Sequence, residues 1–384
     1  MFAYLRNHQF LYAVATLIGM IVGAGTFGIP YVMTQSGFGL GFFYLALIFF
    51  AVLSVHLFYG EIILRTDQPH RLVGYAEKYL GNGVKKIVTF TILIEYYGAL
   101  LVYLILGGEF LKIIFGRWFG GSEFIWVIIF FLLGTAAILC RLKTIARSEF
   151  FMTLLLLATV AVLLIKGAPL INFHYFRGID LKNFFLPYGV ILFAMAGAAA
   201  IPEMRQILKG QERKLKTAIF WGTLIPAVVY LLFAFVVVGV TGSQTTTDAI
   251  SGLVPRLGEW VVGLGAVFGI LAVVTSYIVL GLSLKNIFNQ DYKIAGSVSY
   301  LLVCLVPLIA YFLGLNNFIL IIGLVGAVAS GLDGILTVLI YRRAKKLGGR
   351  QPEYSLKYFK ILGSFLIAIF ALGLIYQLVY LVVK

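Results

Sequence analysis

The sequence contains few charged residues. Asp, Glu, Lys and Arg make up 12% of its 384 residues, whereas soluble globular domains carry about 25%. Hydrophobic residues make up 61% and the mean hydropathy is +1.02, which excludes a soluble globular protein. The longest hydrophilic stretches, near 65–86, 166–183, 241–259 and 342–360, run to about 20 residues each, too short for a core of their own. Any functional site must therefore lie within the apolar segments.

Cysteine and histidine are scarce, with two and four residues respectively. Cys140 and Cys304 lie at or within separate apolar segments without metal-ligand spacing, so we expect small packing residues rather than a disulfide, a zinc site or a nucleophile. The apolar segments contain no set of nucleophile, base and orienting group and no metal cluster. The sequence therefore predicts neither an enzyme nor a bound cofactor.

Apolar runs of membrane-crossing length recur along the whole chain. A helix needs about 20 predominantly apolar residues to cross a bilayer. The sequence predicts an all-α integral membrane protein, a single transmembrane domain over 1–384 with eleven helices. The expected spans are 10–33, 40–64, 87–111, 124–139, 150–165, 184–202, 218–240, 260–284, 294–313, 318–341 and 361–383. The first lacks a signal-peptidase site, so we expect it to remain in the mature protein.

The formal net charge is +15, but the basic residues lie in short connections rather than along one soluble face. This distribution argues for membrane topology and against a nucleic-acid partner. The N-terminus and the even-numbered connections hold 23 of the 30 Lys and Arg residues. By the positive-inside rule, we expect a multi-pass protein of the plasma membrane with a cytoplasmic N-terminus and an extracellular C-terminus.

Two predicted spans are rich in residues that weaken a helix. The first contains GMIVGAGTFGIP at 19–30, and the sixth contains PYGVILFAMAGAAAIPE at 187–203. Unwound backbone at membrane depth persists only where it lines a cavity or binds a ligand, so both segments are candidate binding sites. Close helix packing through small residues is the alternative for each. The two breaks, five helices apart, predict inverted repeats at 9–166 and 184–343, with 358–384 as an additional helix.

Four unusual positions fall at a similar depth. Each lies nine or ten residues from a basic residue on the predicted cytoplasmic side, which is roughly 14 to 15 Å along a helix and about half of the apolar core. These positions are Glu95, Met195, Thr275 and Asp333. Transporters place substrate and ion sites near this level.

Thr275 and Ser276 offer adjacent hydroxyls of the kind that sodium accepts, although such hydroxyls often bond only to their own helix. Glu95 and Asp333 are the acids deepest in apolar spans. Proton coupling and structural pairing are equal alternatives for their role. In the structural alternative, Thr91 hydrogen-bonds the Glu95 carboxyl one helical turn away.

Other polar residues give weaker signals. Tyr96 and Tyr103 share a helix face at seven-residue spacing and are suited to closing over a substrate. Glu61, Glu109 and Glu203 lie near span ends, where we expect hydration or neighbouring bases such as Arg65 and Arg205 to leave them solvated.

Taken in order, the 19–30 motif, the 189–197 segment followed by Ile201-Pro-Glu203, and Thr275-Ser276 resemble the amino acid/auxin permease and hydroxy/aromatic amino acid permease group. This group belongs to the amino acid-polyamine-organocation superfamily. The resemblance covers essentially the whole chain. It implies a bacterial-leucine-transporter-like fold, with broken helices 1 and 6, that alternates between outward and inward access.

The resemblance also implies site residues. Substrate contacts would come from Gly23, Ala24, Gly25, Thr26, Phe193, Ala194 and Ala196, and the sodium-site pattern maps to Gly19, Val22, Ala272, Thr275 and Ser276. The expected function is secondary active transport of an amino acid by symport with Na⁺ or H⁺, with the lipid bilayer as surroundings. A membrane amino-acid sensor of the same fold is the alternative.

Overall fold

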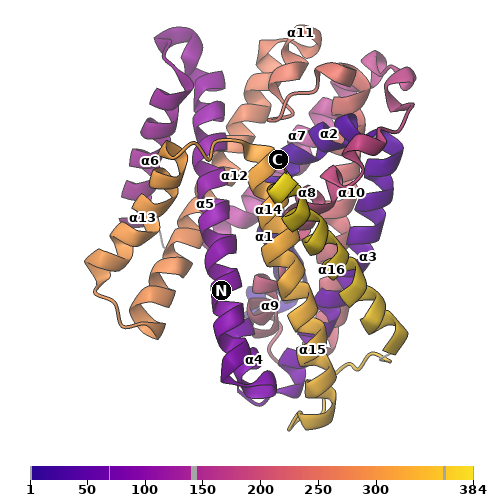
Figure 1. The fold of residues 1–384 in the computed structure, drawn as a ribbon, viewed down its shortest axis with the longest axis vertical. Helices are drawn as coiled ribbons and strands as arrows, with labels where there is room; N and C mark the ends of the chain where they lie inside the picture. Colours follow the sequence, from indigo (N-terminus) through magenta and orange to yellow (C-terminus); the bar gives the residue numbers. More distant parts are fainter. Residues whose placement is uncertain (1, 69, 140–144, 358–359, 384) are drawn as a thin grey trace.

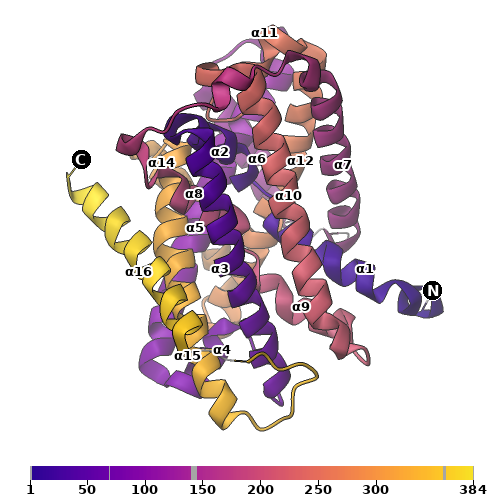
Figure 2. The ribbon, with the colours of Figure 1, turned by 90° about the vertical axis from the view of Figure 1, so that its right-hand side faces the viewer.

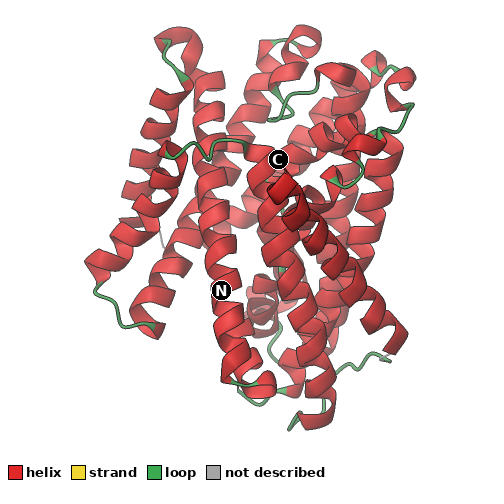
Figure 3. Cartoon of the chain, viewed as in Figure 1, coloured by secondary structure: helices red, strands yellow, loops and turns green. Residues whose placement is uncertain are grey.

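The computed structural model describes residues 2–68, 70–139, 145–357 and 360–383, so Cys140 lies outside the described residues. All regular structure among these residues is helical and none of them lies in a strand (Figure 3). The helices are α1 Phe2–Ile21, α2 Gly25–Ser36, α3 Phe38–Arg65, α4 Leu72–Leu80, α5 Asn82–Phe119, α6 Glu123–Leu139, α7 Ile145–Gly167, α8 Leu186–Met195, α9 Ile201–Ile207, α10 Leu215–Thr241, α11 Val254–Leu257, α12 Glu259–Asn286, α13 Gly296–Phe312, α14 Phe318–Val325, α15 Gly331–Leu347 and α16 Lys360–Val383.

Each predicted span coincides with an apolar helical segment. In the part of the chain that the structure describes, seven helical segments are long and apolar enough to cross a membrane. The pair α1 and α2, bent by 56°, makes an eighth. Three further apolar stretches, in α6, α7 and α13, are shorter. The all-helical membrane class is therefore confirmed, while the number of eleven crossings stays a prediction.

The two interrupted helices lie side by side within the bundle. Helix α2 packs against α8 and α10, and α10 also packs along α1 and α3. On the other side α5 packs against α12 and α14, while α16 lies against α15 on the outside (Figures 1 and 2). The broken segments are thus enclosed by protein, as unwound backbone at membrane depth requires.

Glycines allow α8 to approach the π-helical turn Gly326–Ser330 backbone to backbone. A Cβ atom on Gly326 would overlap the Gly189 carbonyl and would lie 2.7 Å from the Phe193 nitrogen. A Cβ on Gly189 would in turn overlap the Gly323 carbonyl. Because no side chain fits between these segments, α8 packs directly against the end of α14 and the π-helical turn that follows it.

Glu61 near the end of α3 is fully buried, so the expectation that it would be solvated was wrong. Its carboxylate accepts hydrogen bonds from Arg65 Nε (2.8 Å), the Tyr341 hydroxyl (2.9 Å) and the Leu356 N–H (2.7 Å). Glu61 is buried because the connection between α15 and α16 folds back over α3 and excludes water from it. Through Glu61, two groups distant in sequence, the Tyr341 hydroxyl of α15 and the Leu356 N–H of the connection, are thus joined to α3.

Tyr354 fastens the same connection to α3. Its hydroxyl donates to the Leu57 carbonyl at 2.7 Å, and the Arg350 guanidinium donates to the Leu64 carbonyl at 3.0 Å. Burial, with the charge of Glu61 nearby, raises the pKa of Tyr354 well above its ordinary value. The hydroxyl therefore keeps its proton and remains a donor at any physiological pH.

We expect Glu61→Ala to destabilise the protein strongly. Removing the carboxylate leaves the partly buried Arg65 side chain and the buried Tyr341 hydroxyl without this acceptor, and breaking a buried pair costs about 3 to 5 kcal/mol. The unfolding midpoint of the purified protein in detergent measures this loss. The control is Glu77→Ala, which removes an exposed pair with Lys85 and should cost at most about 1 kcal/mol. Equal midpoints for the two variants would refute the assigned role of Glu61.

Candidate functional site

The first break separates α1 from α2. Helix α1 ends at Ile21 and α2 begins at Gly25. The Thr26 N–H bonds to the Gly23 carbonyl at 3.1 Å, but the N–H groups of Gly23, Ala24 and Gly25 find no partner among the described residues. Free amides at the start of a helix favour a negatively charged group. The break thus offers donors suited to a carboxylate.

The second break follows α8. After Met195 the chain leaves the helix at Ala196 and Gly197 and passes through a 3₁₀ turn into α9. The Ala196 N–H donates to the Phe193 carbonyl at 3.2 Å, so that carbonyl is already engaged within the chain. Its second lone pair remains to meet a substrate ammonium.

The two breaks touch at Gly25 and Ala194. A Cβ atom on Gly25 would lie 2.6 Å from Cα and 2.7 Å from Cβ of Ala194, which is closer than real Cβ contacts come. Gly25 is therefore required by space. The contact brings the predicted substrate residues of the first break, 23–26, beside those of the second break, which lie in 193–196.

Hydroxyl groups surround the first break. An atom at the Cβ position of Gly23 would lie 3.7 Å from Ser276 Oγ and 3.8 Å from the Tyr103 hydroxyl. Thr26 is buried, and its hydroxyl has no hydrogen-bond partner among the residues that the structure describes. Buried polar groups normally have partners, so this hydroxyl marks a place that a ligand can fill.

Tyr96 is not the α5 tyrosine that lies against Gly23, since Tyr103 occupies that place. The structure instead sets Tyr96 among charged side chains of the bundle, where it interacts with Glu95, Asp333 and Arg71. The step of seven positions from Tyr96 to Tyr103 spans about 10 Å along the helix. One face of α5 thus serves two separate sites.

Some of the predicted sodium ligands lie near the first break. Ser276 lies beside Gly23, at the end of α1. The Thr275 hydroxyl donates to its own helix, at the carbonyls of Leu271 and Ala272 (both 3.1 Å), which is the alternative considered for it. Gly19 lies in the last turn of α1, and Val22 directly follows that helix. Sodium binding by this set stays a prediction.

Glu95 and Asp333 form one site rather than two. Asp333 on α15 accepts a hydrogen bond from the Thr91 hydroxyl of α5 at 2.9 Å, and its charge interacts with that of Glu95. Thr91 therefore pairs with Asp333 and not with Glu95, as the structural alternative had it. Both side chains are partly buried in the described structure.

A small cavity adjoins the first break. Thr26 and Phe27 line it on one side, and Phe233 and Phe268 lie across from them. It has room for about one water molecule. The surrounding side chains must therefore part to admit anything larger. No cluster of three metal-ligating His, Cys, Asp or Glu side chains occurs among the described residues.

Sequence comparison decides the family. The profile of the tryptophan/tyrosine permease family matches residues 6–381. The chain belongs to this family. The permease is accordingly an amino acid transporter of the membrane and not an enzyme.

The permease is similar to two curated transporters over most of both lengths. It is 24% identical over 355 residues to tyrosine-specific transport system 1 of Haemophilus influenzae, covering 87% of this chain and 88% of that protein. It is 22% identical over 333 residues to glutamine transporter 2 of Aliivibrio fischeri, covering 84% and 86%.

A solved structure establishes the fold of the permease. The crystal structure of MhsT in complex with L-phenylalanine superposes with a TM-score of 0.68 and 15% sequence identity, covering 96% of this chain and 98% of that one. The bacterial-leucine-transporter-like fold implied by the sequence resemblance is therefore confirmed.

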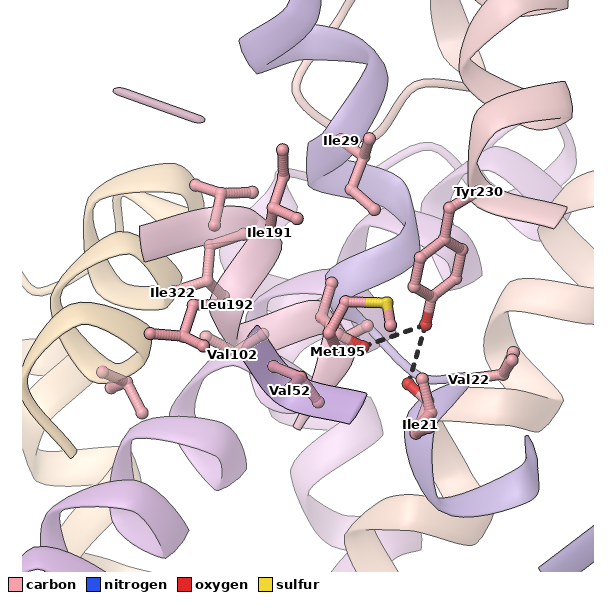
Figure 4. Close-up of a cluster of buried hydrophobic side chains, with 14 of the residues drawn as sticks. Ile21, Val22, Ile29, Val52, Val102, Ile191, Leu192, Met195, Tyr230 and Ile322 are labelled. Carbon is pink, nitrogen blue, oxygen red and sulfur yellow. Dashed lines mark hydrogen bonds between the residues drawn. The ribbon is translucent and has the colours of Figure 1, made fainter. Parts of the chain in front are cut away.

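Sequence reasoning missed Tyr230 of the permease. Its hydroxyl lies between the Ile21 and Ala194 carbonyls, one from each break (Figure 4). The sequence does contain one signal, a single tyrosine in the middle of the strongly apolar helix α10. The hydrogen-bond partners of its hydroxyl cannot be identified until the arrangement of the helices is known.

Proposed function

We propose that the permease binds an amino acid between its two helix breaks and carries it across the plasma membrane by secondary active, cation-coupled alternating access. The observation that carries this proposal is the set of free N–H groups at Gly23, Ala24 and Gly25, enclosed beside the carbonyls of the second break. Opposite helix ends suit the carboxylate and the ammonium of one zwitterion. Gly23, Ala24, Gly25 and Thr26 would meet the carboxylate end.

We propose an aromatic amino acid as the substrate, with tyrosine or tryptophan tried first. Phe27, Phe233 and Phe268 around the cavity next to Thr26 favour an aromatic side chain, because aromatic pairs add to the energy of burial. The family name, the relative named for tyrosine and the structure with phenylalanine point the same way.

For the topology, we propose eleven membrane crossings, a cytoplasmic N-terminus and an extracellular C-terminus. The inverted repeats would cover 9–166 and 184–343, with 358–384 outside them. An interrupted helix near the start of each half supports this division. The excess of Lys and Arg on one side supports the orientation.

For the coupling ion, we propose the proton, held by Glu95 and Asp333. Thr91 hydrogen-bonds one of the two acids, and the acids lie close enough for their charges to interact. Placing two ionisable groups together inside a membrane protein costs free energy, which favours a functional role for the pair. Sodium is the second candidate, which the position of Ser276 beside the first break favours.

Reconstituted vesicles test the transport function. Radiolabelled tyrosine should accumulate inside vesicles above its external concentration when an inward proton gradient is imposed, and should equilibrate without it. Binding of tyrosine without accumulation would support the sensor alternative and contradict the proposal. Competition by unlabelled tryptophan, phenylalanine and glutamine ranks the substrates.

The sodium candidate is tested by the double variant Thr275→Ala, Ser276→Ala. If these hydroxyls ligate sodium, any stimulation of uptake by sodium is lost, because two of the oxygen ligands are removed. Thr89→Ala is the matched control, since Thr89 bonds back to the Lys85 carbonyl of its own helix at 3.0 Å and has no place at the breaks. Sodium stimulation that survives in the double variant excludes this site.

A further inference from the structure

Tyr230 is fully buried in the middle of α10, and its hydroxyl reaches both helix breaks. The hydroxyl lies 2.8 Å from the Ile21 carbonyl and 3.1 Å from the Ala194 carbonyl, so its single proton is shared between them. Figure 4 shows the ring entering from α10 with both carbonyls converging on its oxygen. No other described side chain is recorded donating to either carbonyl.

Both carbonyls belong to the last turn of a helix. Ile21 is the last residue of α1, and Ala194 is the next to last of α8. Carbonyls at a helix end lack partners within the helix and carry the negative end of its dipole. In broken transporter helices such carbonyls commonly coordinate a cation. Here a phenolic O–H meets the same need with a covalently attached donor.

We propose that Tyr230 is a positioning residue of the substrate site, and that its hydroxyl holds the two breaks together where converging carbonyls would otherwise call for a cation. Helix α10 packs along both α1 and α2, so Tyr230 stays with the first broken helix. The bond to Ala194 then fixes the second break against it. This inference rests on the proposed substrate site between the breaks.

The surroundings of Thr26 show what this positioning achieves. The Thr26 hydroxyl lies near Tyr230, but by hydrogen-bond geometry it has no partner among the described residues. Because the Tyr230 proton goes to the two carbonyls, the Thr26 hydroxyl remains for a ligand. The free N–H groups of Gly23, Ala24 and Gly25 are held at the same place. The tyrosine thus engages the Ala194 carbonyl and leaves the amide groups of the first break, and the other carbonyls of the second, open to a ligand.

The variant Tyr230→Phe tests this role, because it keeps the ring and removes only the hydroxyl. Two buried carbonyls lose their donor, and the breaks are no longer held in register. We expect the tyrosine concentration for half-maximal thermal stabilisation of the purified protein to rise about tenfold, the loss that one unmet buried acceptor produces. The KM for uptake should rise by a similar factor.

Tyr277→Phe is the matched control, since Tyr277 is an equally buried tyrosine whose hydroxyl makes no hydrogen bond in the described structure. It should bind tyrosine as the unaltered protein does. Incorporating p-aminophenylalanine at position 230 restores an N–H donor and should recover most of the lost affinity. A merely structural role would lower the unfolding temperature without ligand but leave the half-saturating concentration unchanged.

Two results overturn the inference while leaving the proposed function intact. The first is unchanged half-saturation and KM in Tyr230→Phe, when the unaltered protein accumulates tyrosine. The second is failure of the amino-substituted residue to restore affinity in a protein that folds. If Tyr230→Phe does not fold, the amino-substituted protein alone decides, because it keeps the donor and should bind normally. Absence of uptake by the unaltered protein would instead count against the proposed function.

Discussion

Gly25→Ala is expected to abolish amino acid uptake. The added methyl would lie 2.6 and 2.7 Å from Cα and Cβ of Ala194, atoms that a side-chain rotation cannot move away. One of the two breaks must therefore shift, and a shift of about 1 Å at a binding site costs on the order of a hundredfold in activity. Uptake of radiolabelled tyrosine into vesicles, normalised to the amount of folded protein, measures the loss.

The matched control is Gly263→Ala in α12, another membrane helix. A Cβ atom there would meet no neighbouring atom within 4 Å. Alanine also favours a helix over glycine by about 1 kcal/mol, so this variant should fold and transport normally. Uptake by Gly25→Ala at the level of Gly263→Ala would show that the breaks do not form the site.

Glu95→Gln and Asp333→Asn are each expected to abolish uptake driven by a proton gradient. Amides of nearly the same shape keep hydrogen-bonding capacity but cannot release or accept the transported proton. Exchange of external labelled tyrosine for internal unlabelled tyrosine requires no net proton movement and should persist in both variants. Gradient-driven uptake and exchange are measured in the same vesicle preparation.

Glu109→Gln is the control for this pair. Glu109 is another acid of α5 with a buried carboxylate oxygen, but it lies fourteen residues beyond Glu95 towards the other end of the helix. Its variant should retain gradient-driven uptake. Gradient-driven uptake that is intact in Glu95→Gln and Asp333→Asn would remove the pair from the coupling mechanism and leave sodium as the candidate ion.

The sequence predicts best those features that depend on neighbouring residues. The glycines of 19–30 and the small residues of 187–203 weaken their own helices, and both segments are interrupted in the structure. The meeting of Gly25 with Ala194 followed from the fold that these motifs imply. Local composition and one topological expectation were sufficient to predict the two interruptions and their proximity.

Features that depend on packing between distant helices were not predictable in the same way. Glu61 is buried because a connection almost 300 residues away covers it, as its bond to Leu356 shows. Thr91 bonds to Asp333, on another helix, although Glu95 lies one turn away on its own. Tyr103 rather than Tyr96 meets the first break, and only the packing of α5 against that break decides which of the two tyrosines reaches it. Hydropathy patterns contain no information on these distances.

The position of a bound substrate tests the central claim most directly. An experimental structure of the permease with tyrosine should show the carboxylate at the N–H groups of Gly23, Ala24 and Gly25, and the ammonium at the carbonyls of 193–196. A tyrosine bound elsewhere, for example beside Glu95 and Asp333, with both breaks empty, would contradict the account.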